Sequence, residues 1–305
     1  MARVIETFDL TRRFRRTDAV EGLSLAVESG TIFALVGPNG AGKTTTIKQL
    51  MNLVRPTRGS ARVLGTESQR LGPADLARIG YVSENQRLPD WMTAREMLDY
   101  VKPFYPTWDD QFCERLWARL GIDGRNRLRA LSRGARMKAA LLASLAYRPE
   151  LLILDEPFSG LDALVRVELT EALLELPGEH PWTVFLSSHD IEEVERLADV
   201  IAFIDQGRLV FAEAIESLLA RFRAVEVIFP DGTTPAAVAR PEWLLPEIAG
   251  HTLTFIDTDH AGPEARERLA AGFPGASIRA TALPLREIMV ALGRRAASRP
   301  LERAS

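Results

Sequence analysis

A glycine-rich stretch near the N-terminus combines residues that could bind a chain of phosphates. Residues 37–44 read Gly-Pro-Asn-Gly-Ala-Gly-Lys-Thr and match the phosphate-binding pattern G-x-x-x-x-G-K-[ST]. Its three glycines let the backbone curl so that N–H groups point inward at the phosphates. Lys43 would add a charge near the β- and γ-phosphates, and the Thr44 hydroxyl would bind Mg²⁺. The stretch predicts a nucleoside triphosphate site whose binding residues are Gly37, Pro38, Asn39, Gly40, Ala41, Gly42, Lys43, Thr44 and Thr45.

The flanking residues predict that this loop joins a strand to a helix. Residues 31–36 form a short, apolar and partly β-branched run, which is typical of a buried strand. Residues 45–51 can begin a helix whose positive N-terminal end would face the phosphates. Because strand, loop and helix occur in this order, a Gly-rich turn that binds nothing is the weaker interpretation.

A second apolar run ends in two carboxylates. Asp155 and Glu156 follow residues 151–154, an unbroken run typical of a parallel strand buried on both faces. The carboxyl ends of such strands are where α/β folds bind ligands. Asp155 suits water-mediated Mg²⁺ binding, which needs hard oxygen donors. Glu156 suits the role of general base that polarises a water attacking the γ-phosphate.

The remaining patterns predict an α/β fold with a mainly parallel core sheet. Residues 184–187 and 200–204 repeat the buried-strand pattern, and helical stretches lie between these runs. Residues 1–30 alternate polar and apolar side chains, as half-buried antiparallel strands do. We therefore expect an antiparallel β subdomain beside the parallel sheet.

Two further regions differ in character from this core. Residues 88–148 read as mostly helical, and we expect their aromatic side chains to form the core of a helical subdomain, with a partner-facing groove as the alternative. These aromatic residues are Trp91, Tyr100, Phe104, Tyr105, Trp108, Phe112 and Trp117. After residue 222, short strands at 225–229, 253–256 and 276–280 and a helix at 285–292 predict a small α/β appendage. The predicted domains are 3–222 and 223–295, followed by a disordered tail at 296–305.

Composition limits the class of protein. The chain has 305 residues, a net charge of −3 and a hydrophobic content of 46%, which suit a globular protein of one large domain with or without a smaller one. This charge offers no general attraction to nucleic acid or to an acidic membrane surface. The single cysteine, Cys113, excludes an intrachain disulfide and a cysteine zinc site, and a reducing cytosolic setting fits best. No run of 18 apolar residues occurs, so a partner chain would have to span any membrane.

The order of these motifs resembles the ATP-binding subunit of an ATP-binding cassette (ABC) transporter, over about residues 3–220. The resemblance implies a P-loop NTPase cassette that uses ATP and Mg²⁺. Phe14 falls where the family places an aromatic ring on adenine, although Tyr is more common there. Residues 158–162 look like the D-loop, which puts Asp162 near the nucleotide. Residues 187–190 look like the switch-histidine segment, so that His189 is implied to contact the γ-phosphate and help position the attacking water.

The chain departs from the family pattern at two places. Residues 131–136 read Leu-Ser-Arg-Gly-Ala-Arg where the family signature is Leu-Ser-Gly-Gly-Gln, so Arg133 replaces Gly and Ala135 replaces Gln. Ser132 and Gly134 are retained, and the resemblance implies that this segment completes the ATP site of an opposite subunit from a helix N-terminus. At the Q-loop, Glu84 takes the place of Gln and Gln86 follows two residues later. Either could reach Mg²⁺ or water, and we favour Glu84.

The resemblance also implies two partners. One is a second ABC ATPase chain, identical or not, facing the first head to tail so that ATP holds the pair together. The other is an integral membrane permease, which would make this chain cytoplasmic and peripheral to the inner face of the membrane. Residues 285–289 resemble the tails of bacterial drug- or antibiotic-associated subunits, which favours an exporter. The segment around Leu88, Pro89, Trp91 and Met92 is the candidate docking groove for the permease, with ordinary subdomain packing as the alternative.

Two other functions are weighed against the transporter subunit. A soluble ABC ATPase acting on ribosomes or DNA usually has two cassettes or a long coiled coil, and neither is present here. Its chain would also be more basic, and we expect no nucleic-acid partner. A regulatory protein that binds but does not hydrolyse nucleotide would not need Glu156 and His189.

Overall fold

The computed structural model describes the whole chain except residues 1, 176–181, 231–239, 261 and 299–305. The chain forms two compact units, Met1–Ala212 and Glu213–Ser305. The division lies before the 222/223 boundary expected from sequence, because helix α8 (Ile215–Arg221) belongs to the second unit. Among the described residues, no helix combines the length and apolar character needed to cross a bilayer.

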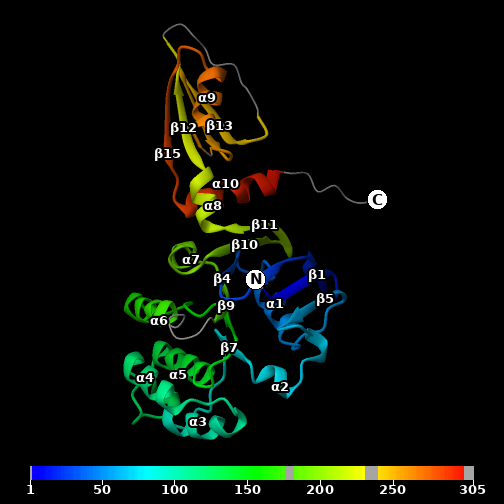
Figure 1. Cartoon of the computed structure of the whole chain (residues 1–305), viewed down its shortest axis with the longest axis vertical. Helices are drawn as coiled ribbons and strands as arrows, with labels where there is room; N and C mark the ends of the chain where they lie inside the picture. Colours follow the sequence, from blue (N-terminus) through cyan, green and yellow to red (C-terminus); the bar gives the residue numbers. More distant parts are fainter. Residues whose placement is uncertain (1, 176–181, 231–239, 261, 299–305) are drawn as a thin grey trace. The chain divides into compact units, whose positions relative to one another are not determined.

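A six-stranded sheet with a parallel core carries the expected buried strands of the first unit (Figure 1). Its order is β11-β10-β4-β9-β8-β7, and the five strands from β10 to β7 in this order are parallel to one another. The strands are β4 (Ile32–Val36), β7 (Ile79–Ser83), β8 (Leu151–Asp155), β9 (Thr183–Ser188), β10 (Val200–Asp205) and β11 (Arg208–Ala214). The register pairs Ser83 with Asp155 and Asp155 with Ser187, so polar residues that end three apolar strands meet at one edge.

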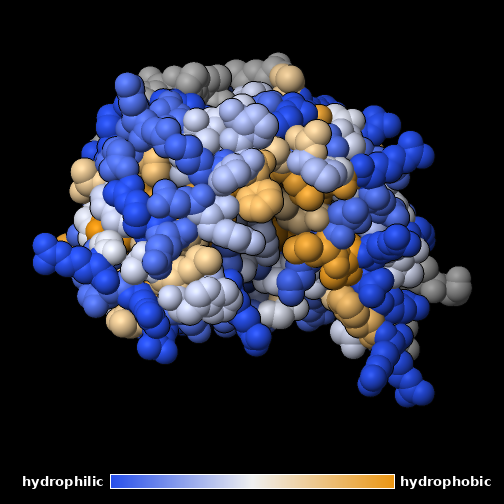
Figure 2. All heavy atoms as spheres, turned by 90° about the horizontal axis from the view of Figure 1, so that it is seen from below, coloured by the Kyte–Doolittle hydropathy of each residue, from blue (hydrophilic) through white to orange (hydrophobic). Residues whose placement is uncertain are grey.

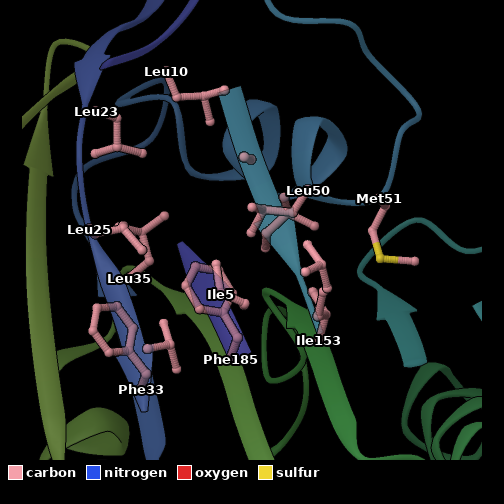
Figure 3. Packing of buried hydrophobic residues seen from close by; sticks show 14 of the residues in the cluster. Ile5, Leu10, Leu23, Leu25, Phe33, Leu35, Leu50, Met51, Ile153 and Phe185 are labelled. Carbon is pink, nitrogen blue, oxygen red and sulfur yellow. The ribbon is translucent and has the colours of Figure 1, made fainter. Parts of the chain in front are cut away.

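An antiparallel sheet forms the predicted β subdomain. It contains β1 (Arg3–Phe14), β2 (Thr17–Leu23), β3 (Ala26–Glu28), β5 (Arg58–Val63) and β6 (Thr66–Glu67). One hydrophobic cluster joins this sheet, helix α1 (Lys43–Leu50) and the parallel sheet (Figure 3). Its members include Ile5, Leu10, Leu23, Leu35, Leu50, Ile153 and Phe185. The Phe33 and Phe185 rings stack at 5.6 Å within it, so burial of apolar surface holds α1 and the loop before it against both sheets.

The helical region has the expected helices and a different distribution of aromatic rings. Its helices are α3 (Ala94–Val101), α4 (Asp110–Leu120) and α5 (Arg133–Leu145), each with an N-cap side chain: Thr93, Asp109 and Ser132. Short 3₁₀ turns lie at Lys102–Phe104 and Leu128–Ala130.

The expectation that the aromatic rings of this region form its core is wrong for several of them. Phe112 is buried, but Trp91, Tyr100 and Phe104 are 68%, 60% and 65% exposed. Aliphatic side chains such as Leu116 and Leu142 are buried in these helices instead, and these rings are left at the surface. The remaining elements of the first unit are a 3₁₀ turn at Ser68–Arg70, α2 (Pro73–Leu76), α6 (Ala163–Glu175) and α7 (Ile191–Leu197).

The second unit is a four-stranded antiparallel sheet with helices. The sheet order is β13-β14-β12-β15, formed by β12 (Arg223–Ile228), β13 (Trp243–Ala249), β14 (Thr252–Asp257) and β15 (Ser277–Ala282). The predicted strands are present, whereas β13 and α9 (Gly262–Gly272) were not predicted. Trp243, Phe255 and Phe273 stack at the centre of its core. Helix α10 (Leu285–Ser298) is longer than expected and includes the first residues of the predicted tail; the rest of that tail lies outside the described residues.

Candidate nucleotide site

The phosphate-binding loop connects β4 to α1 and folds around its own lysine. The Lys43 ammonium donates to the carbonyls of Gly37 (2.7 Å) and Pro38 (3.2 Å). A Cβ at Gly37 would lie 2.1 Å from the Ile204 carbonyl oxygen, so only glycine fits there. Gly42 precedes α1 with φ of +108°, a conformation that glycine adopts without steric cost. Both glycines are therefore required by the local backbone.

Exposure differs along the predicted binding residues of this loop. Pro38, Asn39 and Gly40 are exposed, Ala41, Gly42 and Lys43 are buried, and Thr44 and Thr45 are half-buried at the start of α1. The N–H groups of the first turn of α1 have no intrahelical acceptor, and the helix dipole favours an anion in front of them. The loop thus offers N–H donors suited to an anion, directly after the C-terminal end of β4.

Asp155 connects the loop to two strands of the sheet. Its Oδ1 accepts a hydrogen bond from Thr44 Oγ1 at 3.0 Å and another from Ser187 Oγ at 2.7 Å. The carboxyl group is buried, and this burial raises its pKa. Hydrogen bonds from Ser187 and Thr44 oppose the shift, while the charge of Glu156 adds to it. Thr44 and Asp155 therefore present two hard oxygen ligands side by side.

Glu156 lies between the lysine and the histidine. Its Oε1 is 3.0 Å from Lys43 Nζ, and its Oε2 is 2.7 Å from His189 Nδ1. The residue has φ of +52°, a strained conformation for a non-glycine residue. Its N–H donates to the Ser187 carbonyl and hydroxyl oxygens at 3.2 and 3.0 Å, which holds the backbone in this conformation. The buried carboxylate is thus aimed by its backbone and paired with one cation.

His189 follows β9 and is the more exposed partner of this group. Its side chain is 45% exposed, whereas that of Glu156 is 10% exposed. Since an ionised carboxylate can only accept, the His189 Nδ1–H is the donor in this contact. The sheet register thus joins two residues that are 33 positions apart in sequence.

The signature segment forms the N-terminus of α5. Ser132 Oγ accepts from the Ala135 N–H at 3.2 Å and caps the helix. Gly134 packs against α6, where an added Cβ would lie 2.9 Å from Val165 Cγ1. Asp162 caps α6 in the same way, with Oδ1 accepting from the Val165 N–H at 3.0 Å. Ser132 and Asp162 therefore have a capping role within this chain.

The structure brings Glu84 to the signature segment and the D-loop. Glu84 Oε1 accepts from Ser159 Oγ at 2.8 Å and from Arg133 Nη2 at 2.9 Å. The Ser159 hydrogen bond, together with Arg133, holds the pKa of Glu84 below its usual range against the effect of burial. The other candidate of the Q-loop, Gln86, accepts from the Ser83 N–H at 3.3 Å. These side-chain hydrogen bonds of Glu84 and Gln86 are not to Thr44 or Asp155, the other expected metal ligands.

Phe14 lies at the end of β1, far in sequence from Asp155 and Glu156 and on a different strand. Its ring is 43% exposed, and the Arg12 guanidinium lies 4.4 Å from the ring centroid. One face of the ring is therefore occupied by a cation–π contact, and a stacked base would use the other face.

Ser187 is a site residue to which sequence analysis assigned no role of its own. Its hydroxyl donates to the Asp155 carboxylate and accepts from the Glu156 N–H, so one hydroxyl connects the Asp155 side chain with the Glu156 backbone. The position of Ser187 in the sequence could have identified it as a site residue. It is a polar residue near the C-terminal end of an apolar strand, and this strand lies next to the strand that ends in Asp155.

Comparisons with known proteins identify the family of this chain. The family model described as ABC transporter matches residues 20–159. The bacitracin transport ATP-binding protein BcrA of Enterococcus faecalis is 33% identical over 241 residues, which cover 78% of each chain. The Nod factor export ATP-binding protein I of Paraburkholderia xenovorans is 34% identical over 273 residues, covering 86% of this chain and 88% of that protein. A solved ATP binding subunit of an ABC transporter superposes with a TM-score of 0.64 at 26% identity, covering 70% of this chain and 91% of that one. The chain belongs to the ATP-binding proteins of ABC transporters and is an ATPase of that family.

Proposed function

We propose that this chain is the ATP-hydrolysing subunit of an exporter-type ABC transporter and works with a separately encoded membrane subunit. The observation that carries the proposal is the buried Glu156 carboxylate, held between Lys43 at 3.0 Å and His189 at 2.7 Å beside the phosphate-binding loop. A general base needs a fixed position and a partner that orients it, and Glu156 has both.

Each residue of the site then has a defined role. The loop N–H groups and Lys43 bind the β- and γ-phosphates, and the phosphates replace Glu156 as the principal partner of the ammonium. Glu156 accepts a proton from the attacking water, and His189 contacts the γ-phosphate and orients that water. Ser187 keeps both carboxylates in place through its two hydrogen bonds.

Mg²⁺ fits the ligands that this site offers. Thr44 Oγ1 and Asp155 Oδ1 converge at 3.0 Å, and a hydroxyl with one carboxylate, completed by phosphate oxygens and waters, is a usual ligand set for this ion. Bound there, Mg²⁺ would neutralise charge on the β- and γ-phosphates. The Glu84 carboxylate, bound to Ser159 and Arg133, would reach the ion only by leaving these partners.

We further propose that two such chains complete each other's sites. Ser132 and Gly134 stand at the N-terminus of α5, where free N–H groups and the helix dipole favour a phosphate. Arg133 of this segment is bonded to Glu84, which is bonded to Ser159 of the D-loop, so the segment has a fixed position from which to contact a nucleotide held by a neighbour. Phe14 and Asp162 would contact the same nucleotides.

The membrane subunit is proposed to bind at a large cavity beside the helical region. The cavity has a volume of about 1340 Å³, and its lining includes Leu88, Pro89, Trp91 and Met92. Figure 2 shows hydrophobic residues gathered around a hollow on the face seen from below. An export relative with 34% identity over 86% of the chain supports the direction of transport. The chain would then be cytoplasmic and held at the membrane by this partner.

Glu156→Gln tests the assignment of the base. The amide keeps the shape of the side chain but accepts no proton, so the rate of ATP hydrolysis should fall by about 100-fold or more. ATP should then remain bound, and the variant should run as a dimer with ATP in size-exclusion chromatography. Glu150→Gln is the matched control, since Glu150 precedes the other end of β8 and pairs with Arg78. Equal hydrolysis by wild type and Glu156→Gln would show that the base is another residue.

A further inference from the structure

Two of the positions at which this chain departs from the family pattern, Arg133 and Glu84, are hydrogen-bonded to each other. Arg133, where the family signature has Gly, donates from Nη2 to Glu84 Oε1 at 2.9 Å, and Glu84 stands where the Q-loop usually has Gln. The residues are 49 positions apart in sequence. A neutral pair of positions has thus become an ion pair, and each charge compensates the other.

The D-loop contacts both residues of this pair. Ser159 Oγ donates to the same Glu84 oxygen at 2.8 Å. The Arg133 guanidinium lies over Gly160, where a Cβ would be 2.8 Å from Nη1 and 2.9 Å from Cζ. Gly160 also has φ of +66°, so both its conformation and the close approach of the planar group favour glycine. Three separate segments therefore meet at one guanidinium.

The same residues connect to the carboxylate centre. The Glu84 N–H donates to the Asp155 carbonyl oxygen at 2.9 Å, and Glu156 follows directly. At the other end, Arg133 follows the capping residue Ser132 in the first turn of α5. An unbroken series of hydrogen bonds and peptide units thus joins the carboxylates of one site to the helix end that bears Ser132 and Gly134.

We propose that Glu84 and Arg133 act as one positioning unit, which holds the N-terminus of α5 in register with the carboxylates that hydrolyse ATP. The inference rests on the proposed role of the signature segment in contacting ATP. Neither residue is catalytic, because both act through the elements that they join. The side chains of Arg133 and Glu84 are 48% and 33% exposed, so the pair contributes little to folding and its loss should affect turnover more than stability.

A double-mutant cycle tests whether the two residues act together. Steady-state ATP hydrolysis is measured for the full-length wild type, E84Q, R133G and the double variant E84Q/R133G, which restores the neutral pair of the family pattern. Each single variant leaves a charge or a hydrogen-bonding group without its partner, so kcat should fall about tenfold while KM for ATP changes less than threefold. The double variant should recover to within about twofold of wild type. Single effects that multiply to about 100-fold in the double variant, or single variants that match wild type, would overturn the proposal.

Further variants separate positioning from folding. R133Q and E84Q/R133Q repeat the cycle with a longer side chain, in case glycine in the first turn weakens α5. E114Q is the matched control, because it neutralises the partner of Arg95 in an exposed ion pair between α3 and α4, and it should leave kcat unchanged. The thermal unfolding midpoint should change little in every variant, and a fall that parallels kcat would overturn the positioning role. If the wild type itself hydrolyses no ATP, the proposed function is wrong as well. If the wild type is active and the effects of the two substitutions on kcat multiply in the double variant, only the proposal that Glu84 and Arg133 act as one unit is wrong.

Discussion

At the scale of single residues, one hydroxyl group organises the candidate site. Ser187 donates to Asp155 Oδ1 at 2.7 Å and accepts from the Glu156 N–H at 3.0 Å. The first bond orients the carboxylate that is proposed to bind Mg²⁺, and the second stabilises the left-handed backbone of the proposed base. The register of β8 and β9 brings the serine there, since Asp155 and Ser187 are direct neighbours in the sheet.

Ser187→Ala should therefore impair catalysis more than folding. The Asp155 carboxylate loses a donor and the Glu156 N–H loses an acceptor, and we expect kcat for ATP to fall about tenfold, which corresponds to about 1.4 kcal/mol. Ser144→Ala is the control, because Ser144 is also a buried serine that donates one hydrogen bond, to the Tyr81 carbonyl. Both variants are compared by steady-state hydrolysis and thermal unfolding, and an equal loss of kcat in the two would contradict the role of Ser187.

At the scale of elements, one arginine connects α6 to α7. Arg166 donates to the Leu161 carbonyl at the end of the D-loop, to Asp190 at 3.2 Å and to Glu193 at 2.8 Å. Burial and the nearby Asp190 raise the pKa of Glu193 to about 7, although Arg166 opposes the shift. The helix that follows His189 is thus tied to the D-loop through a carboxylate that titrates near neutral pH.

This raised pKa predicts how stability depends on pH. Since the folded state binds the Glu193 proton more tightly than the unfolded state, the free energy of unfolding should fall as pH rises from about 4.5 to about 7. The contribution is at most about 3 kcal/mol. Glu193→Gln removes the titration, so its unfolding free energy should lose less over this range than that of wild type. Urea denaturation at pH 4.5, 6 and 7.5 measures the difference. If the unfolding free energies of the two proteins changed equally with pH, the raised pKa of Glu193 would be contradicted.

At the scale of the whole molecule, exposed and half-buried aromatic side chains line the cavity where a partner is proposed to bind. Trp91, Tyr100, Tyr105 and Met92 line the cavity of about 1340 Å³, and Trp91 is 68% exposed. An apolar patch of this kind at the surface of one chain is typical of an interaction site. The second unit has its own core of Trp243, Phe255 and Phe273 and contributes none of the candidate site residues.

Trp91→Glu should uncouple transport while sparing folding. The exposed ring contributes little to the core, so the thermal unfolding midpoint should stay within about 2 °C of wild type. A charge in an apolar interface is costly, and transport by the complex with its membrane subunit should be lost. Transport is measured in cells or vesicles that contain both subunits, and unchanged transport would exclude this docking surface. Trp117→Gln is the control, because that ring is half-buried in the same helical region and stacks on Arg95.

Much of the site and of the fold could be predicted from sequence, because local patterns carry their own physical reasons. Glycines with close backbone approach, a lysine and a threonine at fixed spacing identify the phosphate-binding loop, and β4, β8 and β9 are apolar because both faces are buried. The three strands that sequence analysis identified in the second unit are likewise present, as β12, β14 and β15. Local periodicity could not predict β13, α9 or the exposure of Trp91, Tyr100 and Phe104, which depend on what each element packs against.

The sequence by itself determined which residues could bind and cleave a nucleoside triphosphate and the order of the elements that carry them. Only the tertiary structure decided how these residues pair: Glu156 with both Lys43 and His189, Ser187 with the Asp155 carboxylate and the Glu156 N–H, and Arg133 with Glu84. The physical reason is that residue type and local spacing set the chemistry of a motif. Contacts between residues 31 to 113 positions apart follow instead from strand register and helix packing, which are properties of the whole folded chain.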